Sequence, residues 1–591
     1  MEKINDKILK LESEINDLPI GYISKKNING KIRQYHQWIE NGKKKSKYLD
    51  DKSADILAEK INKRRTLEKE LKEMKKQVPK KSKINYSDYH CEILIGDTLR
   101  SFISQASHLN RRPIIQEIID YTKSELNSKV LILYGLRRTG KTTLIQQTIS
   151  SFNDEEYKKT AFMQIRTGNT LADVNSDLKK LQANGFKYIF IDEVTLLEDF
   201  IEGAAIFSDI YAMSGMKIVL SGTDSLGFVF SADDQLYNRC KLIHTTFIPY
   251  KEFESVLGIK GIDEYIRYGG TMSVGGVYYN ANSTFINIES TDEYVDSAIA
   301  RNIQHSLKFY QYENHFRHLQ ELYDNNELTS AINRVVEDIN HRFTIDVLTR
   351  DFISHDLGIS ARNLRHDKDN PTDILDTIDI DSFTERLKQA LEIKNKNEQN
   401  IKITDAHKTE IKEYLDLLDL TVDIPVQTLP VTNNSEYMTV ISQPGLRYSQ
   451  AEELIKQLML DASFQNISAL DRKKISSRIL DEIKGRMMEE IVLLETKKAF
   501  PSKEVFKLKF AVGEFDMVIC DSENVTCEIY EIKHSKEIVS QQYRHLIDDD
   551  KCKATEFRFG SIVRKCVIYR GESKDVENIH YINVEEYLKN L

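Results

Sequence analysis

The sequence predicts a multidomain α/β protein, and three observations lead to this fold class. The chain has 591 residues, and at about 150 residues per domain this length suggests about four domains. Between residues 105 and 250, short apolar runs alternate with helical patterns, which is typical of a parallel sheet covered by helices on both faces. From about residue 446 onward, the predicted order is helix, helix, strand, strand, helix, strand.

The first element, residues 1–83, is predicted as a basic helical hairpin that carries a small β-meander. Apolar residues recur at helical spacing over residues 1–17 and 53–76, and the two helices could pair as an antiparallel coiled coil. Between them lie Asn-Gly pairs at 29–30 and 41–42, the strongest short-range signal for a tight hairpin. The sequence therefore predicts three short strands between the helices.

The charge of this module differs from that of the rest of the chain. Residues 1–83 hold 23 Lys or Arg and 13 Asp or Glu, a net charge of +10, so the remainder carries −19 of the chain's total of −9. Such a division suggests a polyanionic partner such as DNA. Basic residues interleaved with aromatic ones can grip phosphates and stack on bases, but they can equally form the wet outer face of a small sheet. The residues concerned are Lys25, Lys26, Lys31, Arg33, Lys43, Lys44, Lys45 and Lys47, with Tyr22, Tyr35, His36 and Trp38.

The second element, residues 100–255, contains a glycine-rich loop that predicts a phosphate cradle. The apolar run at 130–134 is followed by YGLRRTGKTTL, which fits G-x-x-x-x-G-K-[ST], and then by a helical pattern. Glycine lets the backbone wrap closely around phosphates, while the following helix adds its positive end. Lys141 would reach the β- and γ-phosphates of ATP, and the hydroxyl of Thr142 would ligate Mg²⁺. The predicted nucleotide-binding residues are Gly135, Arg138, Thr139, Gly140, Lys141, Thr142 and Thr143.

Two further predicted strands end in polar residues that complete this site. KYIFIDEV ends in Asp192 and Glu193; Asp192 would hold Mg²⁺ through its water shell, and Glu193 would orient and polarise the attacking water. KIVLSGTDS ends in Ser221 and Thr223, which would sense the γ-phosphate. Because Glu193 would polarise the attacking water, we expect hydrolysis of ATP as well as binding. Without a function, paired acids at the end of a buried strand would cost desolvation energy.

The segments YGLRRTGKTTL, IFIDEV, LSGTDSL, YNRCKLIHTTFIPYKEF and YIRYGG together resemble the prokaryotic AAA+-like ATPases often called archaeal-type ATPases. The resemblance covers about residues 105–591, and the basic module lies outside it. It implies a helical lid at 256–325, a winged helix at 326–440 and a restriction-endonuclease-like domain at 446–591. It also implies an arginine after the sensor strand; Arg239 is the matching residue and would contact the γ-phosphate in cis or from a neighbouring copy in a homo-oligomer. Here YNRC replaces the family's Gly-Arg pair.

Within the expected winged-helix region, 326–440, residues 341–365 resemble a helix-turn-helix. LGIS would supply the turn, and Arg362 and Arg365 would lie on the second helix. An ordinary helical hairpin explains the same pattern, and the sequence does not decide between the two.

The C-terminal region contains a second group of residues suited to chemistry. Alternation along VGEFDMVIC places Glu514 and Asp516 on one face of a strand, and CEIYEIKHS does the same for Glu531 and Lys533. A helix glutamate, a strand aspartate and E-x-K in this order resemble the PD-(D/E)XK nucleases. An E-x-K at an exposed strand edge, or a catalytically inactive fold, is the alternative explanation.

The nuclease resemblance implies a role for each of these residues. Asp516 and Glu531 would hold Mg²⁺ through oxygen ligands, and Lys533 would position or deprotonate water and stabilise the charge developing on phosphate. Glu489 would complete the ligand set or orient a metal-bound water. It is preferred over Glu490 because Gly485, four residues before it, matches the pattern G-x-x-x-E.

These residues predict an enzyme that couples ATP binding and hydrolysis to Mg²⁺-dependent DNA cleavage, with a role in defence against foreign DNA or in mobile-element biology. The alternative is a nucleotide-dependent switch that binds DNA or protein and uses the nuclease-like fold as a scaffold. No run of about 18 apolar residues is present, so we expect no membrane-spanning helix. The N-terminus lacks the apolar core of a signal peptide, and six scattered cysteines suit the reducing cytoplasm.

Overall fold

The computed structural model forms two compact units, Met1–Asp88 and Tyr89–Leu591, and each is described by itself. The second part of the helix-turn-helix stretch, including Arg362 and Arg365, and most of the first predicted helix lie outside the described residues. The structure describes residues 18–28, 31–40, 43–77, 89–125, 128–197, 199–223, 236–271, 294–300, 316–347, 403–431, 435–460 and 467–591, with Leu11, Glu14, Ile15, Phe228, Ile303, Leu307, Phe464 and Gln465.

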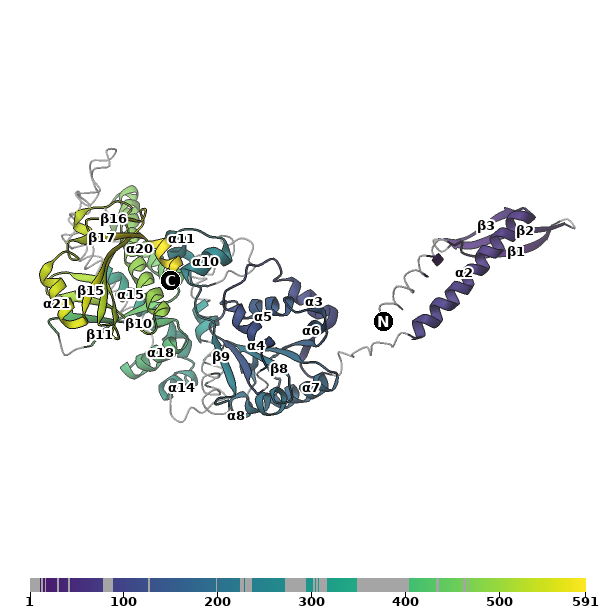
Figure 1. Ribbon diagram of the computed structural model, residues 1–591, viewed down its shortest axis with the longest axis horizontal. Helices are drawn as coiled ribbons and strands as arrows, with labels where there is room; N and C mark the ends of the chain where they lie inside the picture. Colours follow the sequence, from purple (N-terminus) through teal and green to yellow (C-terminus); the bar gives the residue numbers. More distant parts are fainter. Residues whose placement is uncertain are drawn as a thin grey trace. The chain divides into compact units, whose positions relative to one another are not determined.

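The first unit contains the β-meander predicted from the two Asn-Gly pairs. Strands β1 (Tyr22–Ile28), β2 (Lys31–Glu40) and β3 (Lys43–Leu49) form one antiparallel sheet with β2 in the middle. Helix α2 (Asp51–Gln77) follows at once and lies along the strands in Figure 1. Its start is fixed by Asp50, whose carboxylate accepts hydrogen bonds from the backbone N–H and the hydroxyl of Ser53.

The second unit begins with the predicted parallel sheet. Its strands lie in the order β4-β6-β7-β8-β5-β9, and all neighbouring pairs are parallel except β4 with β6. The strand that precedes the glycine-rich loop, β5, therefore lies between β8 and β9. The bounds are β4 (Glu92–Leu94), β5 (Val130–Tyr134), β6 (Thr160–Gln164), β7 (Tyr188–Asp192), β8 (Lys217–Gly222) and β9 (Cys240–His244).

Helices cover this sheet because its strands are apolar on both faces. Leu131 and Leu133 of β5 pack into one apolar cluster with residues of α3, α4 and α5 on one face, while η2 and η3 contact β8. The elements are α3 (Gly96–Ser104), α4 (Ile115–Lys123), α5 (Lys141–Ser150), α6 (Asp154–Lys158), α7 (Leu171–Ala183), η2 (Val194–Leu196), α8 (Phe200–Gly203) and η3 (Phe207–Ala212).

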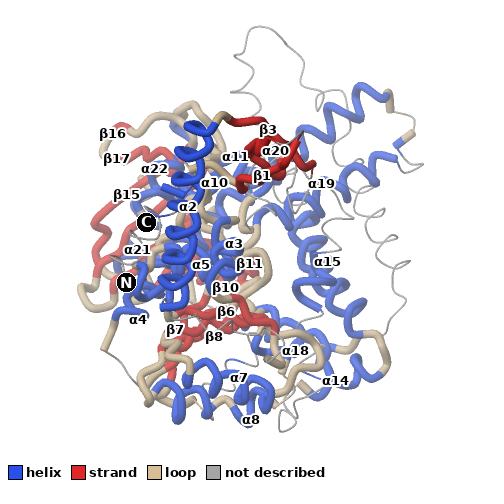
Figure 2. The backbone as a smooth tube through the Cα atoms, turned by 90° about the vertical axis from the view of Figure 1, so that its right-hand side faces the viewer, coloured by secondary structure: helices blue, strands red, loops and turns tan. Residues whose placement is uncertain are grey.

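After β9 the described chain is helical up to residue 347, as expected for the region beyond the sheet. Helix α15 of this region contacts α19, and α19 contacts α20, although both of these helices come later in the chain (Figure 2). No helix among the described residues is both long and apolar enough to cross a membrane. The bounds are α10 (Tyr250–Leu257), α11 (Ile262–Tyr268), η5 (Val295–Ala300), α14 (Arg317–Asp324), α15 (Leu328–Asp346), α18 (Asp405–Leu417), α19 (Pro444–Leu460) and α20 (Ala469–Ala499).

The last region is a second, mixed sheet with helices on both faces. Its order is β11-β10-β12-β13-β14-β15-β17-β16. Helices α19 and α20 share an apolar cluster with one face, and η9 and α21 contribute to the cluster on the other. The bounds are β10 (Thr421–Leu429), β11 (Glu436–Ile441), β12 (Glu504–Phe510), β13 (Glu514–Asp521), β14 (Thr526–Lys533), η9 (Ser540–Tyr543), α21 (Asp549–Phe559), β15 (Ser561–Tyr569), β16 (Lys574–Val576), β17 (Ile579–Asn583) and α22 (Val584–Asn590).

This sheet starts earlier in the chain than the predicted domain boundary at 446. Strands β10 and β11 come from the region assigned to a winged helix, 326–440, yet β10 pairs in parallel with β12 over Val426–Leu429 and Lys507–Phe510. The boundary at 446 is therefore wrong for this sheet. A hairpin gives the same local pattern whether it ends a winged helix or extends a neighbouring sheet, so only the long-range pairing distinguishes them.

Candidate functional site

The glycine-rich loop begins and ends at backbone conformations that favour glycine. Gly135 has φ of 138°, and a Cβ built there would lie 2.4 Å from the carbonyl oxygen of Thr245. Gly140 has φ of 90° and directly precedes α5. Side chains would block both the turn and the close approach of Thr245. The loop thus has the geometry of a phosphate cradle at the N-terminus of a helix.

Gly135→Ala is expected to weaken ATP binding at least tenfold, because the added methyl group must displace Thr245 and distort the loop. Fluorescent ATP-analogue titration measures this change. Gly185→Ala is the matched control: Gly185 also has positive φ, 81°, but a Cβ there would meet nothing within 4 Å. Both variants carry backbone strain of about 1–3 kcal/mol. Equal affinities of the two variants would show that the contact with Thr245 does not shape the nucleotide site.

Lys141 is buried at the first position of α5 and folds back over the loop. Its Nζ donates to the carbonyl oxygens of Gly135, at 2.7 Å, and Leu136, at 2.8 Å. Burial lowers the pKa of Lys141 to about 8, although Glu193 and Asp192 partly oppose this. Both acceptors of this ammonium among the described residues are carbonyl oxygens, which it can exchange for the charged oxygens of a phosphate, since these are stronger acceptors.

Asp192 connects the loop to the two neighbouring strands. Oδ2 of Asp192 accepts from the hydroxyl of Thr142 at 2.9 Å, and Oδ1 accepts from Ser221 at 2.6 Å. Strand β8, which carries Ser221, lies between β5 and β7, so the three groups meet at the carboxyl edge of the sheet. A carboxylate and a hydroxyl oxygen are hard ligands that fit Mg²⁺. Thr142 and Asp192 thus lie in contact with each other, and their binding of Mg²⁺ stays a prediction.

Glu193 follows Asp192 in a left-handed backbone conformation, with φ of 55°. Burial, together with the charge of Asp192, raises the pKa of its carboxyl group. The hydroxyl of Thr223 lies 3.3 Å from Oε2 of Glu193. A carboxylate with raised pKa beside the phosphate cradle is suited to accept a proton from water.

Sequence reasoning missed Arg112, which donates a hydrogen bond to the backbone of the glycine-rich loop. Arg112 is buried; its Nη1 donates to the carbonyl oxygen of Thr139 at 2.8 Å, and its Nε lies 2.5 Å from Oε2 of Glu252 on α10. The hydroxyl of Thr139 also lies 2.9 Å from that of Thr245. These partners are far from Arg112 in the sequence, so no local pattern could reveal them.

The structure does not support Arg239 as a phosphate contact within its own chain. Cys240, the first residue of β9, pairs with Val130 at the start of β5, whereas the loop follows the end of β5. Arg239 thus lies at the opposite edge of the sheet, and its Nη1 is 2.9 Å from Asp209. The prediction of a contact in cis is wrong because the residue precedes β9 instead of following it. A contact from a neighbouring copy stays a prediction.

Two other residues that the sequence assigns to nucleotide binding are Thr143, on α5, and Arg138, in the loop before it. Thr143 is half-buried on α5. Arg138 has positive φ, 65°, and its guanidinium lies 5.6 Å from the ring centre of Tyr294. Tyr294 in turn accepts a hydrogen bond from Gln443 at 2.8 Å. Arg138 is thus directed toward Tyr294, and a phosphate contact would require it to turn.

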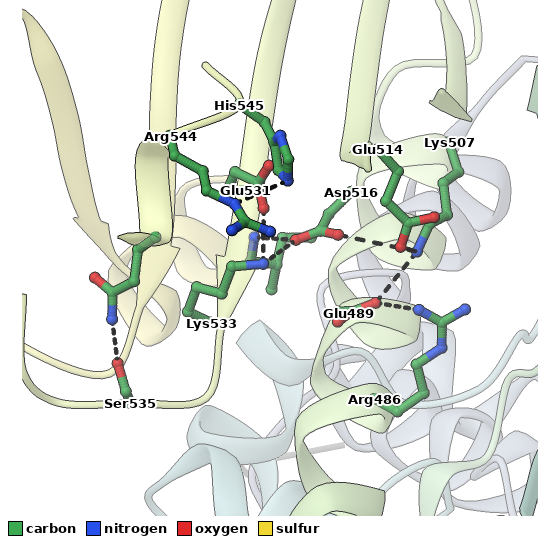
Figure 3. Close-up of polar contacts among 12 residues, drawn as sticks. Arg486, Glu489, Lys507, Glu514, Asp516, Glu531, Lys533, Ser535, Arg544 and His545 are labelled. Carbon is green, nitrogen blue, oxygen red and sulfur yellow. Dashed lines mark hydrogen bonds and ion pairs between the residues drawn. The ribbon is translucent and has the colours of Figure 1, made fainter. Parts of the chain in front are cut away.

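The acid–acid–lysine group of the second sheet converges as predicted (Figure 3). The Nζ of Lys533 lies 2.9 Å from Oδ2 of Asp516 and 2.7 Å from Oε2 of Glu531. The backbone N–H of Ile532 also donates to Oδ2 of Asp516 at 2.8 Å. Strands β13 and β14 are antiparallel neighbours, and their period of two brings these side chains to one face.

Helix α20 adds Glu489 to this group, as the pattern G-x-x-x-E indicates. Oε2 of Glu489 lies 3.6 Å from Nζ of Lys507, which is 3.9 Å from Oδ1 of Asp516. Glu490 forms a buried ion pair with Arg447 elsewhere in the core. The helix therefore presents Glu489 to the site and uses Glu490 for structure.

The carboxyl groups of this site differ in the direction in which their pKa values are shifted. Lys533 and Lys507 hold the pKa of Asp516 below its usual range even though burial opposes this. Burial raises the pKa of Glu489 to about 7, with Arg486 opposing and Asp516 adding to the rise, and burial also raises the pKa of Glu531. Oε1 of Glu531 is buried with no hydrogen-bond partner among the described residues. An unsatisfied carboxylate oxygen beside Asp516 is a suitable ligand for a divalent cation.

Sequence reasoning missed Lys507, a buried lysine on β12 in the centre of this group. Its Nζ lies 2.6 Å from Oε1 of Glu514 in addition to its contacts with Glu489 and Asp516. In Figure 3, Arg544 and His545 lie beside Glu531. The alternation in KEVFKLKF could have placed Lys507 and Lys509 on one face of a strand, but no motif connects that strand to the site.

Another group of possible ligands, His318, Glu321 and His407, lies at the contact of α14 and α18, with one ligand atom of each within 4.8 Å of the others. The Nδ1 of His407 accepts a hydrogen bond from the backbone N–H of Thr404 at 3.2 Å. A neutral ring then carries its proton on Nε2, so neither nitrogen is available to a metal. We propose no metal site there.

Comparisons with known proteins find a similarity in the region of the first site. Residues 127–254 match the protein family model described as AAA domain, so the part of the chain with β5, the glycine-rich loop, β7 and β8 is similar to AAA domains. The chain is 24% identical over 202 residues to the uncharacterized protein MJ1544 of Methanocaldococcus jannaschii, and this match covers 31% of the chain and 44% of that protein. The chain thus spans less than half the length of this curated relative.

Among solved structures, the chain is similar to the Aeropyrum pernix Orc1 protein in complex with DNA. The identity is 12%, and the match covers 60% of this chain and 98% of that one. The TM-score is 0.22, so this likeness carries no argument about fold or function.

Proposed function

We propose that this chain hydrolyses ATP and couples its nucleotide state to DNA binding and Mg²⁺-dependent phosphodiester cleavage. The observation that carries the proposal is the convergence of Asp516, Glu531 and Lys533 on one face of the second sheet. The same chain contains a P-loop domain with Lys141 and Asp192 at its phosphate cradle. Each site therefore has the residues that its chemistry requires.

In the first site, the backbone of the loop and Lys141 would bind the phosphates of ATP. Thr142 and Asp192 would hold Mg²⁺, which would supply positive charge beside the phosphates. Glu193 would take a proton from the water that attacks the γ-phosphate, which its raised pKa favours. Ser221 orients Asp192 through its hydrogen bond and keeps the carboxylate aimed at the loop.

In the second site, Asp516 and Glu531 would hold a divalent cation, with Glu489 completing the ligand set. Such a cation would supply Lewis acidity at the scissile phosphate and lower the pKa of a bound water. Lys533 lies within 3 Å of both strand carboxylates, so it would position the attacking water and offset the negative charge that develops on the phosphate.

One observation favours the alternative, a nucleotide-dependent switch with an inactive nuclease-like scaffold. The ammonium of Lys507 lies among Glu489, Glu514 and Asp516. Together with Arg486 and Lys533, a lysine in this position can offset the charge of the carboxylates and make a metal cation unnecessary. In this alternative, the group would stabilise the fold as an internal network of ion pairs.

Incubation of the full chain with supercoiled plasmid, Mg²⁺ and ATP tests the proposal. We expect nicked and linear DNA that disappears when EDTA replaces Mg²⁺. ATP turnover and DNA binding without any metal-dependent cutting would favour the switch. All six cysteines are free, so the assay uses reducing conditions, in keeping with the cytoplasmic location that we propose.

The N-terminal unit is proposed to contact DNA phosphates. Lys45 and Lys47 are exposed on β3, and Tyr48 beside them is 56% exposed. Deletion of residues 1–88 should weaken DNA binding and flatten its dependence on salt, since each lost phosphate contact reduces the log–log slope by about 0.9. Anisotropy titrations at several salt concentrations measure the slope.

A charge-matched pair of variants controls for net charge in this prediction. Lys45→Gln with Lys47→Gln should reduce the slope, whereas Lys60→Gln with Lys63→Gln, both exposed on α2, should change it less. Equal slopes for the two pairs and the wild type would rule out the meander as the contact and favour a protein partner for this unit.

A further inference from the structure

The carboxyl ends of β14 and β15 carry two basic side chains next to the nuclease-like site. Lys533 pairs with Tyr569 at the end of these parallel strands, so the next residues, His534 and Arg570, lie side by side. The backbone N–H of Arg570 donates to the carbonyl oxygen of Ser535 at 2.9 Å, which fixes this arrangement. The carboxyl edge of parallel strands is where α/β proteins commonly bind ligands.

Helix α20 shows how close this pair lies to the carboxylates. A Cβ built at Gly485 would lie 3.5 Å from Cβ of His534. Glu489 is four residues further along the same helix, one turn or about 6 Å away on the same face. This is an ordinary contact distance, so His534 lies against α20 within one helical turn of Glu489.

An acidic residue of α11, which follows the residues that match the AAA domain, occupies this basic pair. Oδ1 of Asp263, in the first turn of α11, lies 3.0 Å from Nε2 of His534, and Oδ2 accepts a hydrogen bond from Nη2 of Arg570. Asp263 is 37% exposed, so solvent and solutes reach this contact. The start of α11 is also held by Glu585 of α22, whose Oε1 accepts from the backbone N–H of Ile262 at 3.1 Å.

We propose that His534 and Arg570 bind a backbone phosphate of the DNA substrate and that Asp263 occupies this phosphate site in the arrangement seen here. Two oxygens of one carboxylate contact an imidazole and a guanidinium, which is how two oxygens of a phosphodiester would be held. This inference rests on the proposed function, because it assigns a substrate contact to the same site. DNA binding then requires displacement of Asp263, so the acidic side chain limits affinity.

DNA affinity in EDTA tests this competition without cleavage. A fluorescein-labelled 20-base-pair duplex is titrated with the full chain, and anisotropy gives Kd. Asp263→Asn is expected to bind about tenfold more tightly than wild type, while Arg570→Gln and His534→Ala bind at least fivefold more weakly. Glu264→Gln is the matched control, since it removes the same charge from the neighbouring position of α11 and should leave Kd within twofold.

The outcomes separate this inference from the proposed function. Equal affinity of Asp263→Asn, Glu264→Gln and wild type, with DNA bound by all three, overturns the phosphate site and leaves the DNA-binding function in place. A fall in melting temperature of Asp263→Asn without tighter binding also overturns it and shows a purely structural contact. Absence of DNA binding in every variant and in the wild type overturns both. Circular dichroism melting checks that Arg570→Gln folds. If Arg570→Gln does not fold, the affinity of Asp263→Asn for DNA alone decides whether the phosphate site is supported.

Discussion

Replacement of Lys533 by alanine is expected to reduce Mg²⁺-dependent DNA cleavage at least ~100-fold, the loss typical of removing one group that stabilises charge in a transition state. Lys533 lies 2.9 Å from Asp516 and 2.7 Å from Glu531, and no other lysine among the described residues contacts both. Rates of plasmid nicking at saturating Mg²⁺ and ATP measure the loss. ATP turnover should persist, because this lysine lies in a different sheet from the P-loop.

Lys533→Ala also affects stability, since it leaves two buried carboxylates without their cation. Lys533→Arg separates the two effects: it keeps a positive charge for Asp516 and Glu531 but places a broader group where the ammonium was. We expect near wild-type melting with cleavage still strongly reduced. Lys509→Ala is the control, as Lys509 lies on β12 and pairs with Glu436 at 2.6 Å outside the site. If Lys533→Arg and Lys533→Ala both cut DNA at the wild-type rate, the site has no nuclease role.

The two sites differ in how far the sequence could predict them. The P-loop is contiguous, so the residues of YGLRRTGKTTL and the ends of KYIFID and KIVLSG indicate both the fold and the positions of Lys141 and Asp192. The group around Asp516 was found because Asp516, Glu531 and Lys533 each lie at alternate positions of adjacent strands. A contiguous motif carries the prediction in the first site, and strand alternation together with the resemblance to PD-(D/E)XK nucleases carries it in the second.

Residues that depend on long-range packing were not predicted. Arg112 contacts Thr139 and Glu252, which are 27 and 140 residues away, and Lys507 reaches Glu489 from a strand without a motif. Arg239 was placed by resemblance to a segment whose glycine is absent here, and it lies at the other edge of the sheet. Strands β10 and β11 joined the second sheet because pairing with β12, and not local sequence, decides their partner.

Those unpredicted contacts connect the two sites. Arg112 joins the carbonyl oxygen of Thr139 in the loop to Glu252 of α10. Glu254 on the same helix pairs with Lys589 of α22, beside the strand ends that carry Arg570. A shift of the loop on binding phosphate would therefore act on α10, which contacts α22 and through it the second sheet. A variant of the loop tests this coupling through its effect on DNA cleavage.

Lys141→Ala is expected to lower ATP turnover at least ~100-fold and to weaken ATP binding about 10- to 100-fold. The binding loss corresponds to one charge-assisted hydrogen bond of about 1.5–3 kcal/mol. In this variant the carbonyl oxygen of Gly135 loses the ammonium donor and that of Leu136 keeps the hydroxyl of Thr139, so the loop also loses part of its internal contacts. Phosphate release and fluorescent-nucleotide titration measure the two effects.

Glu193→Gln provides the comparison that separates binding from hydrolysis. It keeps a polar side chain beside Thr223 but cannot accept a proton, so ATP should bind within a few-fold of wild type while turnover falls about 100- to 10,000-fold. Lys158→Ala, an exposed lysine on α6, serves as the control for loss of charge in this domain. If DNA nicking depends on bound ATP, Lys141→Ala should no longer nick DNA. Glu193→Gln should nick DNA at the wild-type rate or faster, because this variant still binds the nucleotide. Nicking at the wild-type rate by Lys141→Ala would show that the two sites act independently.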